Sequence, residues 1–193
     1  MADKDAFSER GRTLEEDYFR KREKEVIEKM RRSADADAQR QRLGERTGMA
    51  DADVLRDLQE LGYTAETVML LHLVPLIQTA WAEGSVSDQE RDLIVQAARS
   101  RGIEPASPAD EQLGRWLSAR PSDDLFEKTL RAIRTILQAR PPKERAESER
   151  DLLSLATAIA SASGGILGFG AVSEDERNIL ARITQALDKG AKP

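Results

Sequence analysis

The sequence predicts an all-α protein with a long N-terminal helical arm followed by a compact multi-helix bundle. Residues 1–48 contain 13 basic and 12 acidic side chains, whereas residues 49–193 contain 17 and 23. Apolar residues recur at spacings of three and four along the chain, and no segment alternates as a strand does. Signals that begin and end helices separate these segments. We therefore expect a charged arm over 1–48 and a helical domain over 49–193.

The arm is expected to be one helix, Leu14–Leu43. Residues 13–16 match a capping box, in which a threonine and a glutamate satisfy backbone N–H groups at a helix start. No glycine or proline follows until Gly44, which is the expected stop. Pairs such as Glu28 and Arg32, four residues apart, stabilise an exposed helix. The large apolar side chains form one narrow stripe: Leu14, Tyr18, Phe19, Val26, Ile27 and Met30.

The domain is expected to begin with two helices. Asp51 or Asp53 can cap a short one that ends at Gly62. A longer one is expected over 64–83. Pro75 predicts a kink within it, because proline removes a backbone donor and clashes with the preceding turn.

Five further helices are expected to complete the bundle. Serine N-caps begin the first three, and adjacent prolines at 141 and 142 separate these from the last two. The expected positions are 87–101, from 107, from 122, 143–161 and 174–187.

Two helix-start segments resemble each other. Residues 84–94 read GSVSDQERDLI, and residues 170–180 read GAVSEDERNIL. An internal duplication of a helical hairpin would produce this similarity. Independent use of the same capping chemistry would also produce it, because glycine stops and serine–glutamate boxes are common at helix boundaries.

Composition excludes several classes of function. The chain has no cysteine and one histidine, His72, which argues against thiol catalysis, a histidine triad and a multi-histidine zinc site. His72 lies in an apolar stretch and is expected at the core or its boundary. The net charge of −5 argues against a nucleic-acid partner. No nucleophile–base pair stands out, so we expect a non-catalytic protein. The N-terminus lacks an apolar signal core, which predicts a cytoplasmic location.

Leu152–Val172 is an uncharged run long enough to span a bilayer. It is rich in alanine, serine and glycine, and its apolar spacing favours a buried bundle helix followed by an apolar loop. A membrane span is therefore not expected. The glycines of this run follow a helix and lack the lysine of a nucleotide-binding loop, so we expect a connection. They are Gly164, Gly165, Gly168 and Gly170.

Residues 15–25, EEDYFRKREKE, resemble the inhibitory segment of the mitochondrial ATPase inhibitor protein family. The similarity extends without gaps from about residue 7 to residue 32. It implies a helix that enters the α/β catalytic interface of a rotary F1-type ATPase and inhibits ATP hydrolysis. The implied contact residues are Glu15, Tyr18, Phe19, Arg20, Arg22, Lys24, Glu25, Ile27 and Met30.

This segment departs from the family pattern in two ways. Gly11 stands where the family usually has a glutamate, and the family's histidine-rich coiled coil is missing. The family's pH-controlled oligomerisation is therefore not carried over. The apolar stripe can also dock on the chain's own domain or pair with a second copy, as in a homo-oligomer, and this alternative stays open.

Residues 74–94, VPLIQTAWAEGSVSDQERDLI, are similar to the tellurite-resistance TerB-like family. This resemblance implies a compact helical domain over about 64–188. It also implies metal binding at the acidic turn by Glu83 and Glu90, although Glu83 replaces the family's usual aspartate. We otherwise expect no cofactor. The alternative function is thus a stress-response module that either binds a divalent cation or acts as a scaffold. In both cases the arm would mediate dimerisation.

Overall fold

The computed structural model describes the backbone of residues 2–163 and 172–188, and the side chains of residues 18–162 and 172–187. Every regular element in these ranges is a helix, which confirms the predicted all-α class. The chain divides into two compact units, residues 1–41 (the first unit) and residues 42–193 (the second unit). The change in charge near residue 48 lies close to this division.

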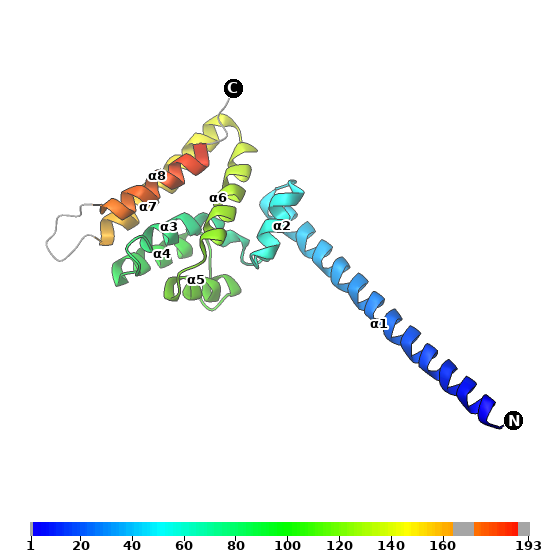
Figure 1. Ribbon diagram of the computed structural model, residues 1–193. Coiled ribbons are helices and arrows are strands. Elements are labelled where there is room, and N and C mark those ends of the chain that lie inside the picture. The colour runs from blue at the N-terminus through cyan, green and yellow to red at the C-terminus, as the bar shows by residue number, and fades with distance from the viewer. Residues whose placement is uncertain (1, 164–171, 189–193) are drawn as a thin grey trace. The chain divides into compact units, whose positions relative to one another are not determined.

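One long helix, α1 (Ala2–Thr47), forms the first unit and contributes its last residues to the second (Figure 1). The predicted start at residues 13–16 is wrong, because the helix already begins at Ala2. The predicted stop at Gly44 is also wrong. Glycine in a helix interior costs about 1 kcal/mol relative to alanine, which a long helix tolerates. The helix ends before Gly48, whose φ of 70° places it in the left-handed region that favours glycine.

Gly44 instead permits close packing within the second unit. A Cβ atom at this position would lie 3.1 Å from the carbonyl oxygen of Met49 and 3.3 Å from Cδ1 of Leu55. Its neighbour Leu43 is fully buried. The lack of a side chain at Gly44 therefore lets the end of α1 approach the segment that follows it.

The described residues of the second unit form eight further helical elements. Four of the predicted N-caps are confirmed, because the side chains of Asp51, Ser87, Ser107 and Ser122 each accept a hydrogen bond from a backbone N–H in the first turn. The elements are α2 (Ala52–Glu60), η1 (Val68–Leu73), α3 (Val74–Ala80), α4 (Asp88–Ser100), α5 (Pro108–Ser118), α6 (Asp123–Gln138), α7 (Pro142–Ser163) and α8 (Glu174–Asp188).

The long helix predicted over 64–83 is two shorter elements. The 3₁₀ helix η1 leads directly into α3, and Pro75 lies in the first turn of α3. A proline there loses no helical hydrogen bond, because the first N–H groups of a helix have no partner within it. Pro75 therefore lies at a boundary between elements and does not kink a single helix.

The core of the second unit is built around α3. Every residue of this short helix is buried, and it packs against η1, α4, α6, α7 and α8. Its one buried threonine, Thr79, donates its hydroxyl to the carbonyl of Pro75 at 3.0 Å. A helix that is buried on all sides has to be surrounded by other elements, and each of these turns its apolar side chains toward it.

The uncharged run over 152–172 begins in α7. Leu152, Ala156 and Ile159 are buried in the core, which confirms the predicted bundle helix. Residues 164–171, which include the four glycines, lie outside the described residues. Within the described ranges, no helix combines the length and the apolar character that crossing a bilayer requires.

Candidate functional site

The described part of α1 carries a set of exposed apolar side chains, which we call the α1 stripe. Phe19, Val26 and Met30 are seven and four residues apart, so they share one line along the helix. From its first to its last residue the stripe extends about 18 Å, at 1.5 Å per residue. Its members and their exposed fractions are Tyr18 57%, Phe19 65%, Val26 50%, Ile27 57% and Met30 67%.

The two aromatic rings of the stripe contact each other edge to face. Their centroids are 6.0 Å apart and their planes are inclined by 72°. A guanidinium nitrogen of Arg22, one turn on, donates to the hydroxyl of Tyr18 at 2.9 Å. This arrangement favours a defined position for the phenol ring while its apolar face stays exposed.

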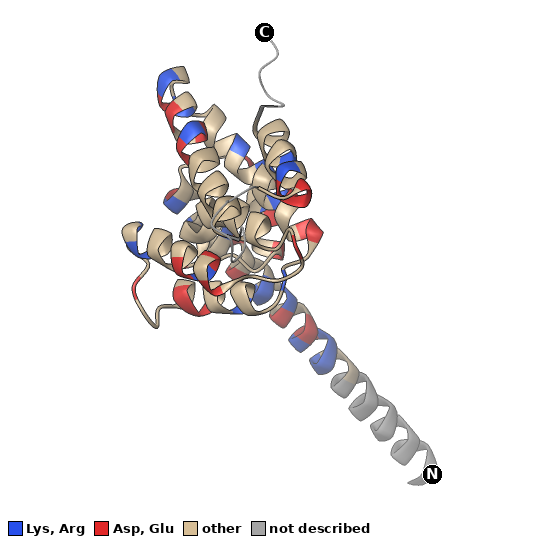
Figure 2. Ribbon diagram, turned by 90° about the vertical axis from the view of Figure 1, so that its left-hand side faces the viewer, with Lys and Arg blue, Asp and Glu red and all other residues tan. Residues whose placement is uncertain are grey.

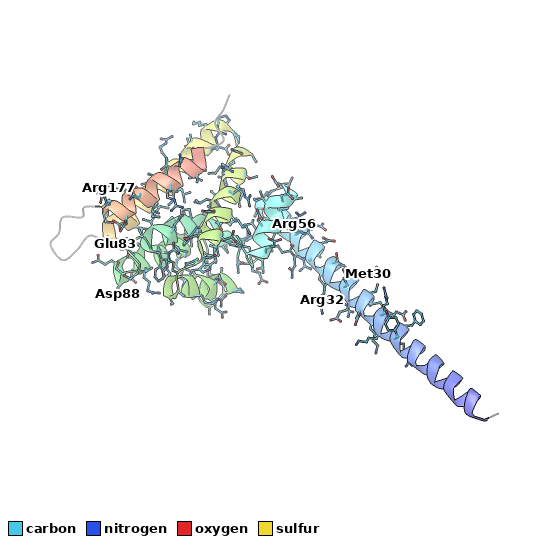
Figure 3. The ribbon with its side chains drawn as sticks, in the orientation of Figure 1. Met30, Arg32, Arg56, Glu83, Asp88 and Arg177 are labelled. Atoms are coloured by element: carbon cyan, nitrogen blue, oxygen red, sulfur yellow. The ribbon has the colours of Figure 1, made fainter. Side chains whose placement is uncertain are left out.

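Charged residues make up much of the described part of this helix, as the blue and red segments of its ribbon show (Figure 2). The predicted ion pair is confirmed, because a guanidinium nitrogen of Arg32 lies 2.6 Å from Oε1 of Glu28. Met30 and Arg32 point to opposite sides of α1 (Figure 3), as expected for residues two apart in a helix. Over residues 18–32, α1 therefore has an apolar face and a charged face.

The structure leaves most of the predicted contact residues accessible. The side chain of Glu15 lies outside the described residues. The other four charged members of the predicted set are exposed on α1: Arg20, Arg22, Lys24 and Glu25.

The two helix-start segments that resemble each other in sequence also share one geometry. Oε2 of Glu90 accepts the backbone N–H of Ser87 at 2.8 Å, and the backbone N–H of Glu90 returns to Oγ of Ser87 at 3.3 Å. At the second start, Oε2 of Glu176 accepts the backbone N–H of Ser173 at 2.7 Å, and the return bond measures 3.2 Å. Both glutamates are buried. The two capping boxes therefore share the same pair of hydrogen bonds.

These capping boxes also lie near each other, at one end of the second unit. Figure 3 places Glu83, Asp88 and Arg177 at this end. Burial raises the pKa of Glu90, hydrogen bonds from Ser87 oppose that rise, and the negative charges of Glu176 and Glu83 add to it. Packing therefore brings the two similar segments close together, and both origins of their similarity, duplication of a hairpin and independent use of capping chemistry, stay open.

The predicted metal ligands differ in their surroundings. Glu83 is exposed, whereas Glu90 is buried and its Oε2 accepts bonds from both the N–H and the hydroxyl of Ser87. Among the described residues, no group of three or more acidic or histidine side chains is arranged to hold a metal ion. The cation site of Glu83 and Glu90 remains a prediction.

His72 lies at the boundary of the core and lines a cavity of about 360 Å³. Three arginines from distant segments, Arg46, Arg101 and Arg140, line the same cavity. Burial lowers the pKa of the imidazole, and the positive charges of Arg101 and Arg140 lower it further. The sequence contained no local signal for this cluster, since its members are tens of residues apart and meet only through the packing of helix ends.

Comparison with known proteins finds no family model, curated protein or solved structure that matches this chain. The two family resemblances therefore remain predictions from short segments of sequence.

Proposed function

We propose that this protein is a non-catalytic regulator that inhibits ATP hydrolysis by a rotary F1-type ATPase, with α1 as the inhibitory ligand. The observation that carries the proposal is the α1 stripe: five large apolar side chains, each at least half exposed, within thirteen residues of one helix. Its tyrosine and phenylalanine belong to the segment that resembles the family of ATPase inhibitor proteins.

The α1 stripe has the form used when a helix binds in a groove. Such helices place apolar anchors at spacings of three, four and seven, and aromatic residues supply much of the binding energy. Fully burying a side chain the size of phenylalanine or methionine contributes about 1.5–3 kcal/mol. Several such anchors can outweigh the loss of translational and rotational freedom on association.

The charged face of α1 supports the same proposal. Arg20, Arg22, Lys24 and Glu25 flank the apolar anchors and are exposed. Charges around an apolar contact mainly set orientation, specificity and association rate. We propose that these residues make the ionic contacts at the α/β catalytic interface, around the anchors Tyr18, Phe19, Ile27 and Met30.

The test measures ATP hydrolysis by purified F1 in the presence of the full-length protein. We expect saturable inhibition that the double variant Tyr18→Ala/Phe19→Ala weakens by at least about 2 kcal/mol, or about thirtyfold in apparent affinity. The matched control is Lys21→Ala/Arg32→Ala, which removes two exposed side chains from the charged face of the same helix. This control should retain more of the inhibition.

Unchanged hydrolysis at micromolar protein, or equal inhibition by the two double variants, would contradict the proposal. The same variants test self-association in sedimentation velocity. A concentration-dependent dimer that the aromatic variant abolishes, without any effect on F1, would assign the α1 stripe to pairing between copies.

The second candidate function is a metal-binding or scaffold module. The observation that favours it is electrostatic: the negative charges of Glu83 and Glu176 both act on the carboxylate of Glu90. A bound cation would relieve this repulsion and stabilise the folded state. We expect calcium, magnesium or manganese to raise the melting temperature of the wild type but not of Glu83→Ala/Glu90→Ala. A wild-type melt that no cation changes would contradict this candidate.

A further inference from the structure

The cavity around His72 combines an apolar floor with a cationic rim. The floor is formed by η1 and α6, through Val68, Met69, Leu71 and Ile136. The rim carries Arg46, Arg101 and Arg140, and none of the described residues that line the cavity is acidic. At about 360 Å³ it falls within the size range of pockets that bind small molecules.

The three arginines stand at the ends of three helices. Arg46 is in the last turn of α1, Arg101 is the C-cap of α4, and Arg140 follows the C-cap of α6. The C-terminus of a helix carries about half a negative charge, so the three ends together offset about half of the guanidinium charge. The remaining positive charge is substantial for one small cavity.

None of these guanidinium groups forms an ion pair with a carboxylate in the part of the chain that the structure describes. Arg101 donates to the carbonyl of Ala97 at 3.3 Å, and Arg140 donates to the hydroxyl of Ser148 at 3.0 Å. Each guanidinium has five N–H groups, so donors remain for a ligand. Planar guanidinium groups bind phosphate and carboxylate in a bidentate manner.

We propose that this cavity binds a small organic oxyanion, a phosphate monoester or carboxylate attached to an apolar group. The anionic end is bound by Arg101 and Arg140 with Arg46, and the apolar end rests on Val68 and Ile136. This site is independent of the α1 stripe, because every residue that lines it belongs to the second unit.

His72 provides a direct reporter, because it is the only histidine in the chain. Arg101 and Arg140 lower the pKa of its imidazole, and Arg46 is the remaining cation that lines the cavity. An anion bound between these arginines offsets their charge, so binding should raise the pKa of His72. The imidazole C–H signals in an NMR spectrum can be followed without overlap from another histidine.

The experiment titrates full-length protein in low-salt Tris buffer with phenyl phosphate, inorganic phosphate or phenol. We expect a saturable shift of the His72 signals with phenyl phosphate and a raised His72 pKa in the complex. Inorganic phosphate should bind more weakly, and phenol should leave the His72 pKa unchanged. No saturable shift at millimolar phenyl phosphate would overturn the proposal, and equal affinity for inorganic phosphate would overturn the apolar subsite.

Paired variants separate the site from general charge. Arg101→Gln/Arg140→Gln should raise the His72 pKa in the absence of ligand and weaken phenyl phosphate binding by about tenfold or more. Arg115→Gln, which alters an exposed arginine of α5, should leave both unchanged. Equal binding by the two proteins would overturn the proposal, provided circular dichroism shows both folded.

Vesicles that contain phosphatidic acid distinguish the two sources of such an anion. Retention of the protein on these vesicles that depends on Arg101 and Arg140 would identify a lipid headgroup as the ligand. Binding of phenyl phosphate without retention on vesicles would assign a free ligand. Either result supports an oxyanion site, and neither depends on inhibition of an ATPase.

Discussion

The two units of this chain differ in how far their large apolar side chains are exposed to solvent. In the described part of the second unit such residues are buried or partly buried, except Leu93, which is 37% exposed. The first unit exposes five of them, each at 50% or more, on one described stretch of helix. Burial in a core stabilises a fold, whereas a contiguous exposed apolar stripe indicates an interaction surface. Variants in the two units should therefore affect different measurements.

The largest expected effect comes from truncating the core. Leu58 is fully buried, so Leu58→Ala should reduce the free energy of unfolding by about 2–5 kcal/mol through lost burial and the cavity left behind. Phe19→Ala should change it by less than about 0.5 kcal/mol, as exposed substitutions do. Urea unfolding followed by tryptophan fluorescence measures this, because Trp81 and Trp116 both lie in the second unit. Similar losses of unfolding free energy for the two variants would contradict this difference between the units.

A smaller effect is expected at the two capping boxes. Ser87→Ala and Ser173→Ala should each destabilise the second unit by about 1 kcal/mol, because each leaves a backbone N–H of a helix start without its partner. The control Ser118→Ala removes an exposed hydroxyl that bonds only within its own helix, and should cost less than about 0.5 kcal/mol. Clearly unequal losses at Ser87 and Ser173 would argue that the two boxes are not structural equivalents.

The helix starts of the second unit were predictable because they depend on local chemistry. Asp51, Ser87, Ser107 and Ser122 cap the helices expected of them, since a side-chain acceptor and the next two or three N–H groups are close in sequence. The start of α1 was mispredicted by the same logic. A capping box inside a long charged helix has the same sequence as one at its beginning.

Features that depend on packing were harder to predict. The sequence predicted a kink at Pro75, but whether a proline lies inside a helix or in its first turn depends on where the preceding 3₁₀ segment ends. The α1 stripe was predictable because all its residues share one helix. The arginine cavity was not, because Arg46, Arg101 and Arg140 meet only after three helices have packed.

The buried glutamate of the first capping box predicts a pH dependence. Because the pKa of Glu90 is raised in the folded state, that state retains a proton which the unfolded chain has already lost. The contribution of Glu90 to the free energy of unfolding is therefore fully present below its ordinary pKa of 4.5. This contribution decreases as the pH rises through the raised pKa that Glu90 has in the folded state. Glu90→Gln removes this titration, so the stability of the wild type relative to Glu90→Gln should fall as pH rises above 4.5. Urea unfolding across this range measures the difference.

The control for that experiment is Glu104→Gln, which makes the same change at an exposed position of the second unit. A difference between wild type and Glu90→Gln that stays constant, or grows with pH, would contradict the assigned cause. In that case the hydrogen bonds from Ser87 would outweigh burial at this carboxylate.

The smallest expected effect lies on the charged face of α1 and tests whether the two units are energetically separate. Glu28 and Arg32 are exposed and four residues apart, so their ion pair should contribute about 0.3–0.5 kcal/mol to the helix at low salt. A double-mutant cycle of Glu28→Ala and Arg32→Ala, read as helical circular dichroism, measures this coupling. It should vanish in 1 M salt, where the screening length is about 3 Å.

The tryptophan-detected unfolding of the second unit should be the same in all four proteins. A shift in that transition would mean that the helicity of the first unit is coupled to the core, so that the exposed stripe and the buried core could no longer be treated as independent features.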